Sequence, residues 1–91
     1  LTWDNFPWPM VRRPKAPDDI TKVGISAYIL SPHYPGLDPT KSDRDRIKDH
    51  IRRWHPDRFE TKVLPRVVEA DRERVQEGAG SVVRGLNDLL R

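Results

Sequence analysis

Residues 46–59 read RIKDHIRRWHPDRF, and the fold that the sequence predicts depends on this stretch. Ile47, Ile51 and Trp54 recur at steps of three and four residues, which is the spacing of side chains along one face of an α-helix. Pro56 lacks a backbone N–H and disfavours helical geometry in the residue before it, so the helix is expected to end near Trp54. Four cations fall outside the apolar stripe: Arg46, Lys48, Arg52 and Arg53. The stretch therefore predicts a basic amphipathic helix that stops at a sharp turn.

A further helix is predicted on each side of this one. Apolar residues recur at helical spacing from Ile20 to Leu30, and Asp18 or Asp19 can serve as the N-cap. The loop that follows, residues 33–39, is rich in turn residues. The predicted fold is all-α, with helices over residues 19–30, 41–54 and 63–90.

The last of these helices is predicted to start near Pro65, because proline is tolerated only in the first turn. The apolar rhythm then keeps its phase as far as Leu90. Gly78 and Gly80 each cost about 0.5–1 kcal/mol relative to Ala in a helix interior. We therefore expect one long helix, which either bends at the glycines or lets another helix approach closely there.

The first 18 residues, LTWDNFPWPMVRRPKAPD, differ in composition from the rest of the chain. They are rich in proline, which favours an extended arm over a helix, and they carry Trp3, Phe6 and Trp8. Large exposed apolar patches are uncommon, so we expect the three rings to pack on the helices as a strap. The alternative is an exposed docking patch for a partner. The predicted organisation is an arm over residues 1–18 and a helical domain over residues 19–91.

Composition excludes several classes of protein. The 91 residues suffice for one small domain, and a net charge of +3 attracts acidic partners only mildly. The absence of cysteine fits a reducing compartment, the cytoplasm or the nucleus, and no apolar run is long enough to span a membrane. The three histidines show no metal-ligand spacing and no nucleophile sits in a catalytic motif, so neither a metal, a cofactor nor an enzyme activity is expected.

The tripeptide His55-Pro56-Asp57 carries a resemblance to a known family. With the helix before it, it resembles helix II and the following loop of J domains, the modules through which J-proteins engage Hsp70 chaperones. ISAYILS upstream and VVRGLNDLL downstream resemble the ends of helices I and III of that family. The segment after Asp57 is longer than in ordinary J domains. It resembles a divergent group found at the C-termini of many fungal proteins and in an ankyrin-containing relative of the inhibitors of NF-κB.

The resemblance implies a J-like antiparallel helical hairpin and a co-chaperone function. The domain would bind an Hsp70 and stimulate its ATPase, with Asp57 pairing with an Hsp70 arginine. Pro56 would fix the turn and His55 would orient it. The partner-binding residues that follow are His55, Pro56, Asp57 and Arg58 in the loop, and Arg46, Lys48, Arg52 and Arg53 on the helix.

Three alternatives stay open on the sequence. The first is a degenerate J-like protein-interaction module, in a larger assembly, that does not stimulate an Hsp70. The second is nucleic-acid binding through the helix cations and through Arg12, Arg13 and Lys15. It is less favoured, because acidic residues are interleaved throughout. In the third, His55-Pro56-Asp57 only stops one helix and caps the next, and the arginines form an ordinary solvated face.

Overall fold

The computed structural model describes residues 1–34 and 38–91, and the chain is helical, without a β-strand, in these residues. The prediction of an all-α fold is confirmed. Part of the predicted 33–39 loop, residues 35–37, lies outside the described residues. The α-helices are α1 (Lys22–Ile29), α2 (Asp43–Trp54), α3 (Pro56–Arg58) and α4 (Glu69–Leu90). Three short turns complete the helical structure: the 3-10 turns η1 (Pro17–Asp19) and η3 (Leu64–Arg66), and the π turn η2 (Phe59–Val63).

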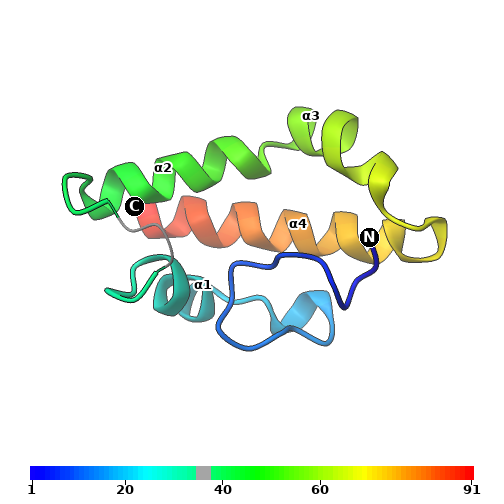
Figure 1. Ribbon diagram of the computed structural model, residues 1–91, viewed down its shortest axis with the longest axis horizontal. Helices are drawn as coiled ribbons and strands as arrows, with labels where there is room; N and C mark the ends of the chain where they lie inside the picture. Colours follow the sequence, from blue (N-terminus) through cyan, green and yellow to red (C-terminus); the bar gives the residue numbers. More distant parts are fainter. Residues whose placement is uncertain (35–37) are drawn as a thin grey trace.

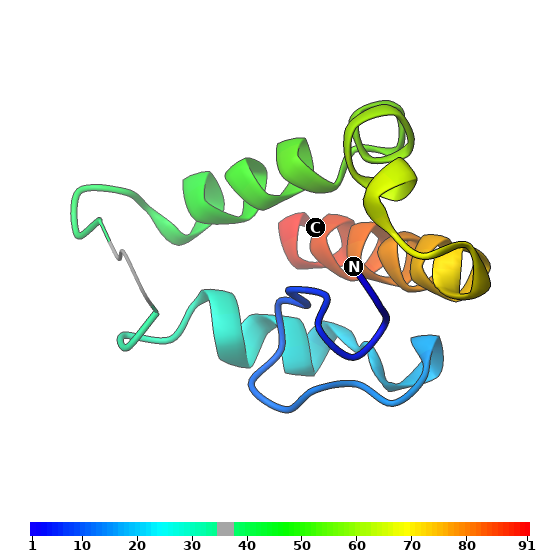
Figure 2. The same cartoon turned by 45° about the vertical axis from the view of Figure 1, so that its right-hand side comes forward.

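The long helix α4 lies at the centre of the fold. It runs antiparallel to α2, with α1 on its other side (Figures 1 and 2). The arm at the start of the chain crosses beside α4 and α1, and the α3–η2–η3 segment connects the end of α2 to the start of α4. Every other large element therefore packs on the last helix of the chain.

The start of α1 differs from the prediction. Asp18 and Asp19 lie in the η1 turn, and Thr21 is the N-cap, because its hydroxyl accepts a hydrogen bond from the Gly24 N–H at 3.1 Å. In α2 the N-cap is Ser42, whose hydroxyl accepts a hydrogen bond from the Asp45 N–H at 3.1 Å, and the helix ends at Trp54, as predicted. A hydroxyl at an N-cap satisfies one of the free N–H groups of the first turn, which explains both starts.

The last helix starts later than predicted, at Glu69 instead of residue 63. Val67 and Val68 have extended backbones, with ψ of 138° and 140°, and they separate η3 from α4. The side chain of Val67 is 1% exposed, and the Val68 N–H donates to the Leu1 carbonyl at 2.7 Å. Pro65 lies in the first turn of η3 instead of α4. Core packing and a contact with the arm therefore break the helix where the apolar rhythm continues.

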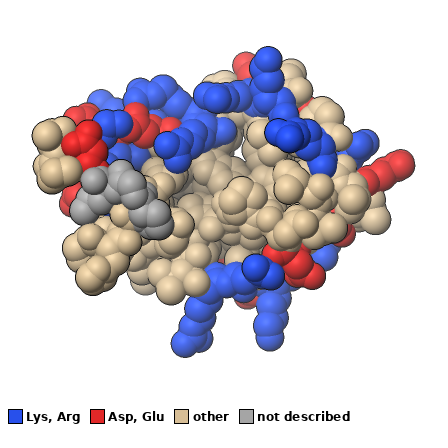
Figure 3. Space-filling view, in the orientation of Figure 1, with Lys and Arg blue, Asp and Glu red and all other residues tan. Residues whose placement is uncertain are grey.

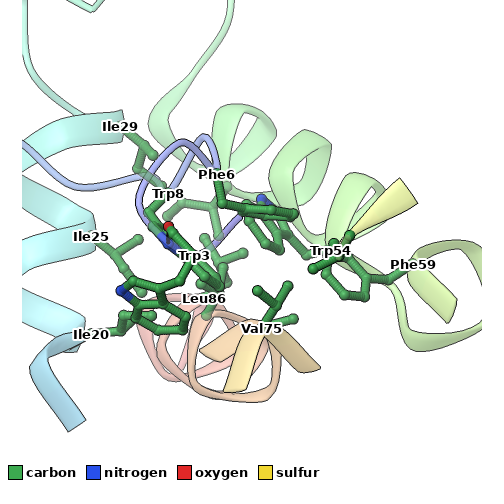
Figure 4. Close-up of a cluster of buried hydrophobic side chains, with 14 residues drawn as sticks. Trp3, Phe6, Trp8, Ile20, Ile25, Ile29, Trp54, Phe59, Val75 and Leu86 are labelled. Carbon is green, nitrogen blue, oxygen red and sulfur yellow. Dashed lines mark hydrogen bonds between the residues drawn. The ribbon is translucent and has the colours of Figure 1, made fainter. Parts of the chain in front are cut away.

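The aromatic side chains of the arm are part of the core. Trp3, Phe6 and Trp8 are at most 6% exposed, and the rings of Trp8, Trp54 and Phe59 stack in sequence, with centroid separations of 5.7 Å (Figure 4). The two arm indoles are also hydrogen-bonded, Trp3 Nε1 to the Pro14 carbonyl at 2.7 Å and Trp8 Nε1 to the Trp3 carbonyl at 3.2 Å. The arm is thus fixed both by apolar burial and by satisfied polar groups.

The helix α4 passes through Gly78 and Gly80 without a break. Of the two alternatives for the glycines, a bend or a close approach by another helix, a close approach occurs at Gly78, but not by a helix. The group that packs over Gly78 is the arm, through Trp8 and Trp3.

Candidate functional site

The corner between α2 and η2 consists of His55, Pro56, Asp57 and Arg58, all of them exposed. His55 has an extended backbone and its Nδ1 accepts a hydrogen bond from the Asp57 N–H at 3.3 Å. Pro56 begins α3, where its missing N–H leaves no donor unsatisfied. His55 thus ends α2 and caps the next helical turn, so the local sequence fully explains the geometry of this corner.

The side chains of Asp57 and Arg58 extend from this corner. Asp57 lies in the first turn of α3, where a carboxylate interacts favourably with the helix dipole. Within residues 1–34 and 38–91, neither side chain forms a hydrogen bond or an ion pair. The corner therefore presents one free carboxylate and one free guanidinium to solvent.

Arg46 holds two elements of the fold together. Its side chain is 12% exposed, and its guanidinium donates hydrogen bonds to the carbonyls of Ile29 and Ser31 at the end of α1. It also lies 5.5 Å from the centroid of the Tyr34 ring. These contacts satisfy carbonyls that a helix C-terminus leaves free. Arg46 thus has a structural use that the sequence did not indicate.

The other cations of α2 fall into two groups. Arg52 pairs with Asp49, which also pairs with Lys41, and these two hydrogen bonds hold the pKa of Asp49 below its ordinary value. Arg44, Lys48 and Arg53 are exposed and have no ion pair with any residue that the structure describes. Figure 3 shows Lys and Arg along one edge of the molecule, over α2 and the α3–η2 segment. The structure thus brings Arg53 and Arg58 to the surface near the corner, whereas Arg46 is turned inward.

A pocket of about 310 Å³ lies beside this edge, and no sequence pattern indicated it. We call it the aromatic pocket. Its apolar wall combines the arm with the end of α2 and with η2, and it consists of Phe6, Pro7, Pro9, Trp54, Phe59 and Val63. No motif or spacing could have revealed the pocket, because its residues come from segments that are far apart in the sequence.

The polar side of the aromatic pocket consists of Tyr28, Tyr34, His50 and Arg53. The Tyr34 hydroxyl and His50 Nε2 are hydrogen-bonded at 3.1 Å, while His50 Nδ1 is buried without a partner among the described residues. Burial lowers the pKa of His50, and the nearby Arg53 lowers it further. His50 is therefore neutral at physiological pH, and Arg53 supplies the charge in this pocket.

No group of three or more His, Cys, Asp or Glu side chains within residues 1–34 and 38–91 could hold a metal ion. No helix in the same residues is both long enough and apolar enough to cross a membrane.

The fold and the corner define a small all-helical domain with an exposed, partly basic surface. A family model described as NF-kappa-B inhibitor-like protein 1 C-terminal domain matches residues 33–91, more than half of the chain. The chain belongs to this family. Comparison with curated proteins and comparison with solved structures each give no match.

The identification of the chain as a J domain is wrong, because the matching family is a different one and no J-domain family matches. The corner explains the error in physical terms. A histidine cap followed by proline and a first-turn aspartate is a general way to stop one helix and start another. The tripeptide therefore does not identify a family, and the Hsp70 co-chaperone function that it implied loses its support.

Proposed function

We propose that this chain is a protein-interaction module and that the corner His55–Arg58 belongs to its contact surface. The observation that carries the proposal is that Asp57 and Arg58 extend into solvent without a partner in the described part of the chain. A negative and a positive charge side by side favour a partner surface that presents a cation and an anion at matching positions. Charge pairs across an interface contribute mainly to the specificity and the rate of association.

Membership of the family supports the same proposal. The family description names an NF-kappa-B inhibitor-like protein, which is consistent with a domain that binds another protein. The proposed role is therefore binding and not catalysis, and the proposed compartment is the cytoplasm or the nucleus, where a chain without cysteine is at no disadvantage.

Site-specific photo-crosslinking in cells tests the proposal. A photoreactive residue replaces Arg58 at the corner, and the control carries the same residue at Val23, which is 78% exposed on α1. The helices that carry these positions, α3 and α1, lie on opposite sides of α4 (Figure 1). We expect a protein that is crosslinked from position 58 and not from position 23.

The purified partner then provides the decisive measurement. Its affinity should fall by about tenfold for Arg58→Glu, which reverses a charge at the contact, and should be unchanged for Val23→Glu. Crosslinking that is equal at the two positions would overturn the proposal. Recovery of RNA or DNA alone, with an affinity that falls steeply as salt is raised, would instead support the nucleic-acid alternative.

A further inference from the structure

The aromatic pocket has a rigid apolar wall. The Phe6 ring lies between three other rings, with centroid distances of 4.6 Å to Trp8, 5.8 Å to Trp54 and 5.8 Å to Phe59 (Figure 4). All four side chains belong to the hydrophobic core. The wall is therefore held in place by the same packing that stabilises the fold, so the pocket exists before any ligand arrives.

The size and the lining of the pocket suit one bulky side chain. Its volume of about 310 Å³ is at the lower end of the range for ligand pockets, which are mostly apolar with a few placed polar groups. Aromatic rings pair favourably with other rings in offset or edge-to-face arrangements, beyond the gain from burial alone. An aromatic side chain therefore fits this pocket better than an aliphatic one.

The charge of the pocket indicates which group of the ligand lies next to its aromatic ring. Among the described lining residues, Arg53 is the one with a formal charge, since His50 is neutral, and it has no ion pair with a described residue. A guanidinium binds a carboxylate through two parallel hydrogen bonds. Lys and Arg, interleaved with Asp and Glu over α2, also lie along the adjacent edge of the molecule (Figure 3). The ligand should thus place a carboxylate beside its aromatic ring.

We propose that the aromatic pocket binds an aromatic side chain of an acidic peptide segment in a partner protein, with a neighbouring carboxylate bonded to Arg53. The inference rests on the proposed protein-interaction function, and it adds a second contact to the corner. A peptide is favoured over single-stranded nucleic acid, which requires a continuous basic groove along its backbone. The described lining of the pocket offers a single cation.

An NMR titration of the whole chain with short synthetic peptides tests the inference. The probe is acetyl-Glu-Trp-Glu-amide. The matched peptides replace Trp by Ala, or both Glu by Gln. The three indole N–H signals of the chain provide the readout, since Trp54 lines the pocket whereas the Trp3 N–H is buried against the Pro14 carbonyl. We expect the Trp54 signal to shift and the Trp3 signal to stay unchanged.

Two variants at exposed positions of α2 distinguish binding in the pocket from a general attraction of the acidic probe to the positive charge of the chain. Arg53→Gln should weaken the binding of the probe by about fivefold, because it removes a charged hydrogen bond. Lys48→Gln, which also removes one positive charge but lies outside the pocket, should leave the affinity unchanged. Each matched peptide should bind more weakly than the probe. Any one of three results would overturn the inference. The two variants could weaken the binding of the probe equally, the Trp54 signal could stay unshifted, or oligothymidylate could bind more tightly than the probe at the pocket.

The affinity of the partner found by crosslinking for two variants shows whether this inference and the proposed function fail together or separately. If Arg53→Gln leaves the partner's affinity unchanged while Arg58→Glu reduces it, the pocket inference fails and the interaction module stands. If neither variant changes the affinity, the proposed function fails as well. If both variants reduce the partner's affinity, the contact at the corner and the contact at the aromatic pocket are both supported.

Discussion

Gly78 lies directly against the indole of Trp8. A Cβ atom added to this glycine would be 2.6 Å from Cη2 of Trp8, closer than real Cβ atoms approach, and 3.0 Å from Cζ3 of Trp3, a tight contact. Both indoles are buried and hydrogen-bonded, so neither can move aside without breaking other contacts. The absence of a side chain at this point of α4 is what allows the arm to pack against the helix.

Alanine substitutions at the two glycines of α4 should have opposite effects. Gly78→Ala forces the indoles apart and should lower the free energy of unfolding by about 1–3 kcal/mol. A Cβ at Gly80 would meet only the flexible end of Arg84, at 3.3 Å, so Gly80→Ala should raise the free energy of unfolding by about 0.5–1 kcal/mol through helix propensity. Urea denaturation measures both. Equal effects of the two substitutions would contradict the packing described for the arm.

Removal of an arm indole should destabilise the whole domain. Trp3 is 2% exposed and Trp3→Ala should lower the free energy of unfolding by about 3–5 kcal/mol, the loss typical of a large core aromatic. Val23→Ala on the exposed face of α1 serves as the control and should change it by less than about 0.5 kcal/mol. Thermal denaturation followed by circular dichroism would show this difference. A domain that keeps its melting temperature without the Trp3 ring would mean that the arm does not belong to the core.

Arg46 should stabilise the fold although it lies among the cations of α2. Arg46→Gln leaves the carbonyls of Ile29 and Ser31 without their charged donor, and the free energy of unfolding should fall by about 1.5–3 kcal/mol. Arg44→Gln, at an exposed position of the same helix, should change it by less than about 0.5 kcal/mol. Urea denaturation at constant salt compares the two. Similar losses would show that the net charge of α2, and not the bonds to α1, governs stability.

Stability should decrease in mildly acidic solution because of His50. Its pKa in the folded state is lowered from the ordinary value of 6.5 by burial, and then by Arg53 and Arg46, while Asp49 opposes the shift. The unfolded chain therefore binds a proton more readily than the folded one. The contribution of His50 to the free energy of unfolding is fully present above the pKa that His50 has in the unfolded chain. It is lost as the pH falls below that pKa.

The corresponding measurement is the change in the free energy of unfolding from about pH 7.5 to about pH 5.5. His50→Gln should reduce this change relative to the unaltered chain, whatever its effect at neutral pH. An identical pH dependence in the two proteins would show that protonation of His50 is not coupled to unfolding.

The parts of the fold that were predictable have local signals. Ser42 and Pro56 mark the two ends of α2 by an N-cap hydroxyl and by a ring that cannot continue a helix. The start of α4 has no such signal. Val67 and Val68 continue the apolar rhythm, and only tertiary contacts with the core and with Leu1 make their backbone extended.

The candidate site was predictable only where neighbouring residues define it. The exposed corner follows from the turn at Pro56. The role of Arg46 does not, because its acceptors are carbonyls 15 and 17 residues earlier in the sequence. The family was also not decided by the tripeptide at the corner, since the same three residues serve as an ordinary junction between helices.

The packing of the arm on α4 has a consequence for how the domain forms during synthesis. The indoles of Trp3 and Trp8 leave the ribosome before the helix that covers them, because α4 follows the other described elements in the sequence. Domains generally fold as units and expose apolar surface until their last element is present. We therefore expect the nascent chain to remain unfolded until α4 has been translated, and to fold in one late step. A chain that stops within α4 would leave its tryptophans exposed, which makes it a substrate for proteolysis or aggregation instead of a shorter, working domain.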